Sequence, residues 1–129
     1  LMLGTNDLKK RFGMTAFTIG GGVTALVKAA RLHAMNAEGL PPKILIVAPP
    51  PVAENMMETR HAPIFGEDSI AVSRELGPEL RRVAKLMRCE FLDAAPYGEV
   101  SRADAVHMTR EGHLRLAEAL HEKVWEILK

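Results

Sequence analysis

The sequence has little cysteine and no long apolar run, and both absences narrow the kinds of protein that it can encode. Cys89 is the only cysteine among the 129 residues, so the chain forms no internal disulfide, which is typical of a reducing compartment. We therefore favour a cytoplasmic location. Every uninterrupted apolar segment falls well short of the roughly 18 residues that a transmembrane helix needs, and we expect no membrane partner.

The sequence also has no large excess of positive or negative charge. The formal net charge is +1, which gives no support for a nucleic-acid partner. Residues 9–11 form one short basic cluster, and the other basic residues of the middle segment lie among apolar positions of a helical pattern. We interpret them as solvated helix faces. With 47% hydrophobic and 26% charged residues, the composition is that of an ordinary globular domain.

Two kinds of hydrophobic pattern alternate along the chain. Apolar runs predict strands at 1–3, 43–50 and 89–95. Helical periodicity predicts helices at about 15–36, 69–88 and 110–128. The order β-α-β-α-β-α is typical of parallel strands joined by right-handed crossovers, and unbroken apolar strands need helices on both faces of the sheet. We therefore predict an α/β fold with a parallel sheet.

Several local signals refine this prediction. Thr15 is a candidate N-cap for the first helix, and Pro78 is expected to kink the second helix or to restart it. Residues Gly20–Gly22 interrupt the first helical pattern, and we interpret them as close packing against a neighbouring element rather than as a phosphate-binding loop. Residues 51–68 form a long irregular stretch. Such loops usually line a functional site or a subunit interface, and we expect a homo-oligomer.

In open α/β sheets the chemistry lies beyond the carboxyl ends of the strands, where two polar motifs occur in this chain. Gly4-Thr5-Asn6-Asp7 follows the first predicted strand, and Asp104-Ala105-Val106-His107 precedes the last helix. One turn of chain separates Asp104 from His107, so the carboxylate can accept the imidazole Nδ1–H while Nε2 faces the opposite way. This arrangement predicts the aspartate–histidine half of a nucleophilic triad.

These motifs support a family resemblance. The segments LGTNDLKKRF, ILIVAPPPV and DAVHMTREGH, in this order across nearly all 129 residues, resemble the arylesterase and acyltransferase branch of the SGNH (GDSL-type) serine hydrolases. The resemblance implies a flavodoxin-like three-layer α/β/α sandwich. It also implies that the substrate is a small carboxylic ester, that acyl transfer is a further activity, and that the reaction uses neither a cofactor nor a metal.

The resemblance also assigns roles to individual residues. Asn6 matches the asparagine whose side-chain amide donates to the oxyanion, and Gly4 and Asp7 match the turn that supports it. Asp104 and His107 match the catalytic aspartate and histidine. A side-chain amide on a tight turn at a sheet edge can be aimed at the developing negative charge without reorganisation.

One part of the family pattern has no counterpart in the chain. The nucleophilic serine of the family lies in a G-D-S motif before the asparagine block, and a glycine between the two supplies a second oxyanion donor. Residues Gly66–Ser69, GEDS, follow the asparagine block and precede a helix, so we expect Asp68 or Ser69 to be an N-cap. We interpret residues 1–129 as the C-terminal portion of a single domain whose N-terminal strands and nucleophile lie outside this chain.

This interpretation makes the missing N-terminal segment a partner of the chain. An edge formed by the apolar residues Leu1–Leu3 would lack its neighbour. We therefore expect residues 1–129 alone to be inactive and not to form a stable monomer.

Alternative interpretations of the same residues exist. Asn6 and Asp7 also fit a simple Asx turn, Asp104 fits a helix cap, and a lone histidine such as His107 is often a surface residue. The remaining histidines, which are His33, His61, His113 and His121, have no partner at metal-ligand spacing in the sequence. We expect the last two to be exposed.

Two interpretations of function from other classes also remain open. A non-catalytic flavodoxin-like binding or scaffolding module would carry Asp104 and His107 without using them. A nucleotide-binding α/β domain is less well supported, because the chain has no glycine-rich strand-to-helix turn. The apolar residues of the long loop fit an acyl or alcohol pocket as well as an oligomer contact; they are Met56, Met57, Ile64 and Phe65.

Overall fold

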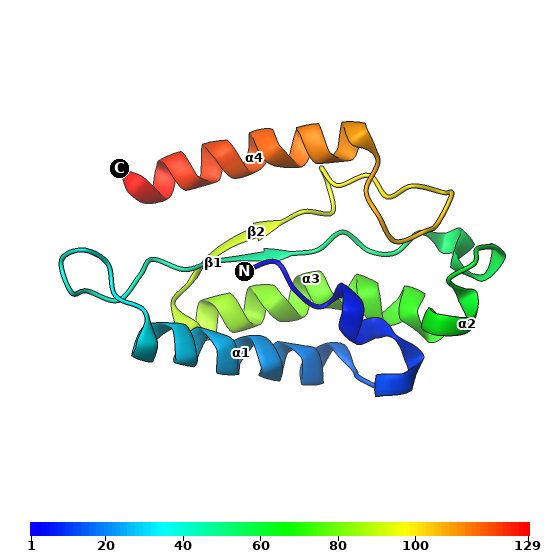
Figure 1. The fold of residues 1–129 in the computed structure, drawn as a ribbon, viewed down its shortest axis with the longest axis horizontal. Coiled ribbons are helices and arrows are strands. Elements are labelled where there is room, and N and C mark those ends of the chain that lie inside the picture. Colours follow the sequence, from blue (N-terminus) through cyan, green and yellow to red (C-terminus); the bar gives the residue numbers. More distant parts are fainter.

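A small parallel sheet lies at the centre of the computed structural model, which describes all residues from Leu1 to Lys129 (Figure 1). Strand β1 (Leu45–Ala48) pairs in parallel with β2 (Glu90–Asp93). On the other side of β1, Met2 forms a single parallel bridge with Val47, and the Val47 N–H donates to the Leu1 carbonyl at 2.8 Å. The predicted parallel α/β arrangement is confirmed, with shorter strands than expected and with residues 1–3 contributing only a bridge.

Three long helices match the three predicted ones. They are α1 (Ala16–His33), α3 (Asp68–Met87) and α4 (Arg110–Leu128). The shorter elements are the 3-10 helices η1 (Thr5–Leu8), η2 (Lys10–Phe12) and η3 (Glu54–Glu58), and the one-turn helix α2 (Ala62–Phe65). The last two fall within the long loop that the sequence predicts. None of the helices combines the length and the hydrophobicity needed to cross a membrane.

The side chains of β1 alternate between two cores. Ile46 and Ala48 are buried in a cluster with apolar side chains of α1 and α3. Val47 points the other way, into a smaller cluster with Leu116 of α4. Helices therefore cover both faces of the strand pair, with α1 and α3 together on one face and α4 on the other (Figure 1).

The strands differ in burial, which departs from the prediction that all of them are fully covered. Residues Ile46–Ala48 of β1 are buried, whereas Phe91 and Leu92 of β2 are only partly buried. Residues Leu1–Leu3 are exposed. The physical reason is position, since β1 has neighbours on both sides while β2 and residues 1–3 have β1 on one side only.

The predicted N-cap of α1 is confirmed, and the predicted close packing of Gly20–Gly22 holds for Gly20 alone. The Thr15 side chain accepts a hydrogen bond from the Thr18 N–H at 3.2 Å, as an N-cap does. A Cβ added to Gly20 would lie 2.5 Å from Oε1 of Glu79 in α3, so this glycine allows close packing of the two helices. The same explanation fails for Gly21 and Gly22, whose added Cβ atoms would meet nothing within 4 Å.

The start of α3 differs from its prediction. Neither Asp68 nor Ser69 is an N-cap, because Glu67 occupies that position without a side-chain hydrogen bond. The Ser69 hydroxyl instead donates to the Gly66 carbonyl at 2.7 Å. The hydroxyl thus stabilises the turn that precedes the helix and does not cap the first N–H groups of the helix. Pro78 lies inside α3, which continues through it as one helix.

Candidate functional site

The segments that follow the strands meet at one edge of the sheet. The turn from Gly4 to Asp7 follows the bridge at Met2, and residues 49–53 follow β1. The Ala53 N–H donates to the Ala105 carbonyl at 2.9 Å. This bond fixes the loop after β1 to the Asp104–His107 turn, which comes from the segment between β2 and α4.

Asp104 and His107 form a hydrogen-bonded pair. The distance between Oδ2 of Asp104 and Nδ1 of His107 is 2.8 Å. The other carboxylate oxygen, Oδ1, accepts the backbone N–H groups of Val106 and His107, each at 2.9 Å. Backbone N–H groups of the same turn therefore hold the Asp104 carboxylate in place, and the carboxylate orients the His107 imidazole. Asp104 does not cap α4, because that position belongs to Thr109, whose side chain accepts from the Gly112 N–H.

The turn between these two residues has an unusual backbone. Ala105 has a φ of 63°, in the left-handed region that residues with a Cβ rarely adopt. Its side chain is fully buried, and its N–H donates to the Ser101 carbonyl at 2.8 Å. Surrounding contacts thus hold a strained conformation, which is a common feature of functional turns.

The electrostatics of the pair follow from these bonds. Partial burial of the Asp104 carboxylate opposes its ionisation, but the N–H groups of His107 and Val106 and the His107 ring outweigh that effect. They hold the pKa of Asp104 well below its ordinary value. The side chain therefore remains a carboxylate at neutral pH and can stabilise a positive charge on His107.

Asn6 lies free at the surface of the neighbouring turn. Its residue is exposed, and no hydrogen bond of its side chain is found within the chain. The turn is closed by the backbone instead, since the Asp7 N–H donates to the Gly4 carbonyl at 3.1 Å. An Asx turn at Asn6 or Asp7 therefore finds no support.

Gly4 sets the direction of this turn. Its φ of 121° is accessible to glycine, and a Cβ at this position would lie 3.3 Å from Cγ2 of Ile19 and 3.4 Å from Cδ1 of Leu76. We expect Gly4→Ala to lower the free energy of unfolding by about 1–3 kcal/mol, because it adds backbone strain and crowds the core. Urea unfolding of the complete protein measures this change.

Gly21→Ala is the matched control for that substitution. Gly21 lies in α1, and a Cβ added there would meet no atom of another element within 4 Å. Alanine at this position should therefore raise the free energy of unfolding by up to about 1 kcal/mol. Equal effects of the two substitutions would contradict the special role of the Gly4 backbone.

Asn6 and His107 line the same two hollows. One, of about 400 Å³, is completed by Lys9, Arg11, His61, Ile64, Phe65 and Val106. The other, of about 220 Å³, is completed by Met2, Thr5, Pro50, Val106, Met108 and His113. The structure thus brings the predicted oxyanion donor and the predicted base to one place, although their catalytic roles remain predictions.

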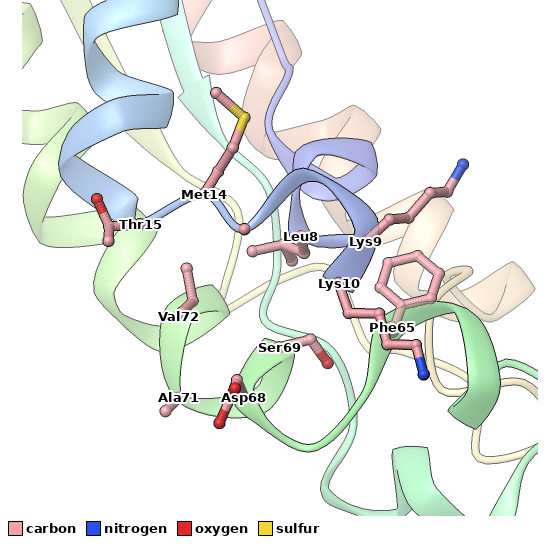
Figure 2. Close-up of a pocket in the computed structure, with 11 residues that line it drawn as sticks. Leu8, Lys9, Lys10, Met14, Thr15, Phe65, Asp68, Ser69, Ala71 and Val72 are labelled. Atoms are coloured by element: carbon pink, nitrogen blue, oxygen red, sulfur yellow. The ribbon is translucent and has the colours of Figure 1, made fainter.

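The four apolar residues of the long loop have different surroundings. Phe65 is buried in the same core cluster as Met56, and Met57 is exposed. Met56 is fully buried in the core, whereas Ile64 and Phe65 line the hollow beside His107. Phe65 and Lys9 also line another hollow of about 360 Å³, which Figure 2 shows between the starts of α1 and α3. That hollow contains neither Asn6 nor His107.

His61 is the site residue that the sequence does not predict. Its ring lies 6.2 Å from the His107 ring and 6.1 Å from the Phe65 ring, measured between centroids. No sequence spacing links His61 to Asp104 and His107, because the contact is made between distant segments. The only signal was the length of the loop that carries it. Of the other histidines, His113 and His121 are exposed, as expected.

No hydroxyl group of the chain forms a hydrogen bond with the His107 ring. The hydroxyl groups of Ser69 and Ser73 donate to backbone carbonyls, and that of Ser101 accepts from the Ala103 N–H. Ser69 is also buried. The arrangement within these residues therefore contains a histidine–aspartate pair and a free amide, but no hydroxyl in position to act as a nucleophile.

Comparison with solved structures identifies close structural relatives. One solved structure superposes with a TM-score of 0.92 at 35% identity and covers 98% of this chain. Est24, a carbohydrate acetylesterase from Sinorhizobium meliloti, gives a TM-score of 0.85 at 32% identity over 98% of the chain. The aryl esterase of M. smegmatis gives 0.78 at 31% identity over 94%.

The chain spans only part of these relatives. It covers 57%, 59% and 58% of their respective lengths. The sequence matches no protein-family model, and no curated protein matches it significantly. The similarity therefore lies in one portion of a larger esterase fold.

Proposed function

We propose that the chain forms part of a serine esterase acting on small carboxylic esters. The premise is its resemblance to the C-terminal portion of SGNH (GDSL-type) serine hydrolases of the arylesterase-like branch. The observation that carries the proposal is the 2.8 Å contact between Asp104 and His107 in a hollow shared with Asn6. In this proposal the nucleophilic serine belongs to a part of the domain outside these residues. We place this serine beside Nε2 of His107, where its hydroxyl can donate a proton to the ring.

The proposed reaction uses His107 as a general base and then as a general acid. His107 takes the serine proton as the hydroxyl attacks the ester carbonyl, and it returns a proton to the leaving alcohol. Asp104 keeps Nδ1 protonated and stabilises the imidazolium that forms between these steps. A water molecule, activated in the same way, then releases the acid. An alcohol in place of water gives acyl transfer, which we include in the proposal.

Asn6 is proposed to stabilise the tetrahedral intermediates. Its amide has no partner within the chain and lines both hollows together with His107. A free donor at the rim of the site is available to an oxyanion at no cost of breaking an existing bond.

The proposal extends to the fold and the assembly. The exposed apolar residues Leu1–Leu3 beside β1 support a wider parallel sheet, completed by strands outside this chain in a flavodoxin-like three-layer sandwich. We also propose that the complete protein is a homo-oligomer.

A serine-reactive fluorophosphonate probe tests the proposed function directly. The complete protein should become covalently labelled at one serine outside residues 1–129, because only an activated serine attacks the phosphorus rapidly. His107→Ala should slow labelling on the order of 10³-fold or more, whereas His33→Ala, at the exposed end of α1, should not. Absence of labelling in a folded complete protein would instead favour a non-catalytic binding module.

A further inference from the structure

We propose that His61, Asp104 and His107 form a binding site for zinc or a similar transition-metal ion, and that the bound ion blocks ester hydrolysis. The binding part of this inference rests on the geometry of the chain alone. The inhibitory part rests on the function proposed above. The site lies where the long loop meets the turn before α4.

The three side chains already lie close to one another. A nitrogen from each histidine and a carboxylate oxygen of Asp104 all fall within 4.8 Å of one another. Zinc–nitrogen bonds are about 2.0–2.1 Å long, so ligand atoms in a tetrahedral site lie roughly 3.3 Å apart. The His107 side chain is 72% exposed, so packing does not prevent the rotation that would close the remaining gap once the ion replaces its hydrogen bond to Asp104. The fourth position would be left to water.

His61 supplies the second, independent observation. Both of its ring nitrogens are buried and neither has a hydrogen-bond partner within the chain. A buried polar group without a partner is costly and uncommon. The edge contacts with Phe65 and His107 hold the ring in place. A metal ion between His61 and His107 would give one of these nitrogens a strong partner.

The donor set indicates which ions are suitable. Two imidazoles with one carboxylate suit zinc, copper, nickel or ferrous iron, whereas magnesium and calcium prefer sites made of oxygen atoms. Lys9 and Arg11 line the same hollow, and their positive charges oppose any cation. This repulsion further disfavours ions that are held mainly by charge. We therefore expect zinc binding without magnesium or calcium binding.

A metal ion at this site is incompatible with the proposed role of His107. If Nε2 coordinates the ion, its lone pair cannot accept the serine proton. If Nδ1 coordinates the ion, the 2.8 Å hydrogen bond to Asp104 is replaced by a metal–nitrogen bond. The ring proton then moves through water from Nδ1 to Nε2, which is left without a lone pair for the serine proton. In both cases the imidazole can no longer act as a general base.

Calorimetric titration of the chelator-treated complete protein with zinc chloride tests the binding part. One zinc should bind at this site, and neither magnesium nor calcium should replace it. His61→Phe and His61→Gln should weaken zinc binding at least about tenfold, since even outer-shell partners of a metal are worth 10–100-fold. The two variants differ in how they fill the loop, so the test stands if only one of them folds.

His113→Ala is the matched control. His113 is exposed and lines the adjacent hollow with His107, yet it lies outside the proposed set of ligands and should leave zinc affinity unchanged. The proposal is overturned if the wild-type protein binds no zinc, if both folded His61 variants bind it as tightly as wild type, or if His113→Ala alone abolishes binding.

Hydrolysis of an activated aryl ester tests the inhibitory part. Zinc should slow wild-type turnover, and each His61 variant, compared with its own zinc-free rate, should need at least about ten times more zinc for the same effect. Binding that depends on His61 without any slowing of an active esterase would overturn inhibition. A protein without esterase activity would refute the proposed function, and the calorimetry would then decide the metal site alone.

Discussion

In the complete protein, His107→Ala is expected to slow acylation by an activated aryl ester on the order of 10⁴–10⁶-fold, the range found when the histidine of a triad is removed. Without the imidazole no group takes the proton from the attacking serine. The side chain is 72% exposed, so its removal should change the free energy of unfolding little. Burst kinetics with the aryl ester measures the acylation step by itself.

Testing Asp104, the partner of His107, needs a substitution that keeps the hydrogen bonds of the turn. Asp104→Ala would leave two backbone N–H groups without their acceptor and would damage the turn as well as the chemistry. Asp104→Asn keeps one oxygen for those groups. It turns an N–H toward Nδ1 of His107 and favours the wrong tautomer, which should cost about 10⁴-fold in turnover.

Combining the substitutions separates a catalytic unit from two independent contributions. Residues that act as a unit lose activity non-additively, so the Asp104→Asn/His107→Ala double variant should be little slower than His107→Ala alone. His33→Ala should keep full activity. Acylation at the wild-type rate in a folded His107→Ala protein would contradict the assignment of His107 to a catalytic triad.

The depressed pKa of Asp104 also has a consequence for stability. Its folded-state pKa lies below the ordinary value, so ionisation stabilises the folded state above the ordinary aspartate pKa. That contribution declines as the pH falls toward the folded-state pKa. The turn that carries His107 should therefore lose stability in acid rather than in alkali.

Local sequence patterns predict the parts of this site that depend on neighbouring residues. The spacing of Asp104 and His107 brings them together because a single turn connects them, and the 2.8 Å contact follows from it. The Thr15 cap and the limits of α4 are local in the same sense. Gly4 is recognisable because a turn directly after an apolar run often needs a residue without a Cβ.

Features set by distant contacts are not predictable in this way. His61 reaches Asp104 and His107 only because the long loop folds against the last turn. The burial of β2 depends on which strands flank it rather than on its own apolar residues. The start of α3 differs in that its cause is local, since the Ser69 hydroxyl donates to the Gly66 carbonyl only three residues earlier. It caps no helix N–H, although serine favours the N-cap position.

The second large effect is expected at the oxyanion. Asn6→Ala in the complete protein should lower the turnover number about 10²–10³-fold, the loss typical of one removed oxyanion donor. The Asn6 amide makes no bond within the chain, so its contribution should appear only when negative charge develops on the substrate. The Michaelis constant and the melting temperature should therefore change little. Steady-state kinetics and thermal unfolding of the same preparation measure all three quantities.

Two further variants make this test specific to charge and position. Asn6→Asp keeps the size of the side chain but replaces the donor with a carboxylate, which repels an oxyanion, so it should be at least as slow as Asn6→Ala. Asn36 offers the matched control, because its side chain accepts the N–H groups of Glu38 and Leu40 in a loop after α1. Asn36→Ala should lower the melting temperature without changing turnover. If Asn6→Ala behaves like Asn36→Ala, Asn6 is only a turn residue and the oxyanion donor lies elsewhere.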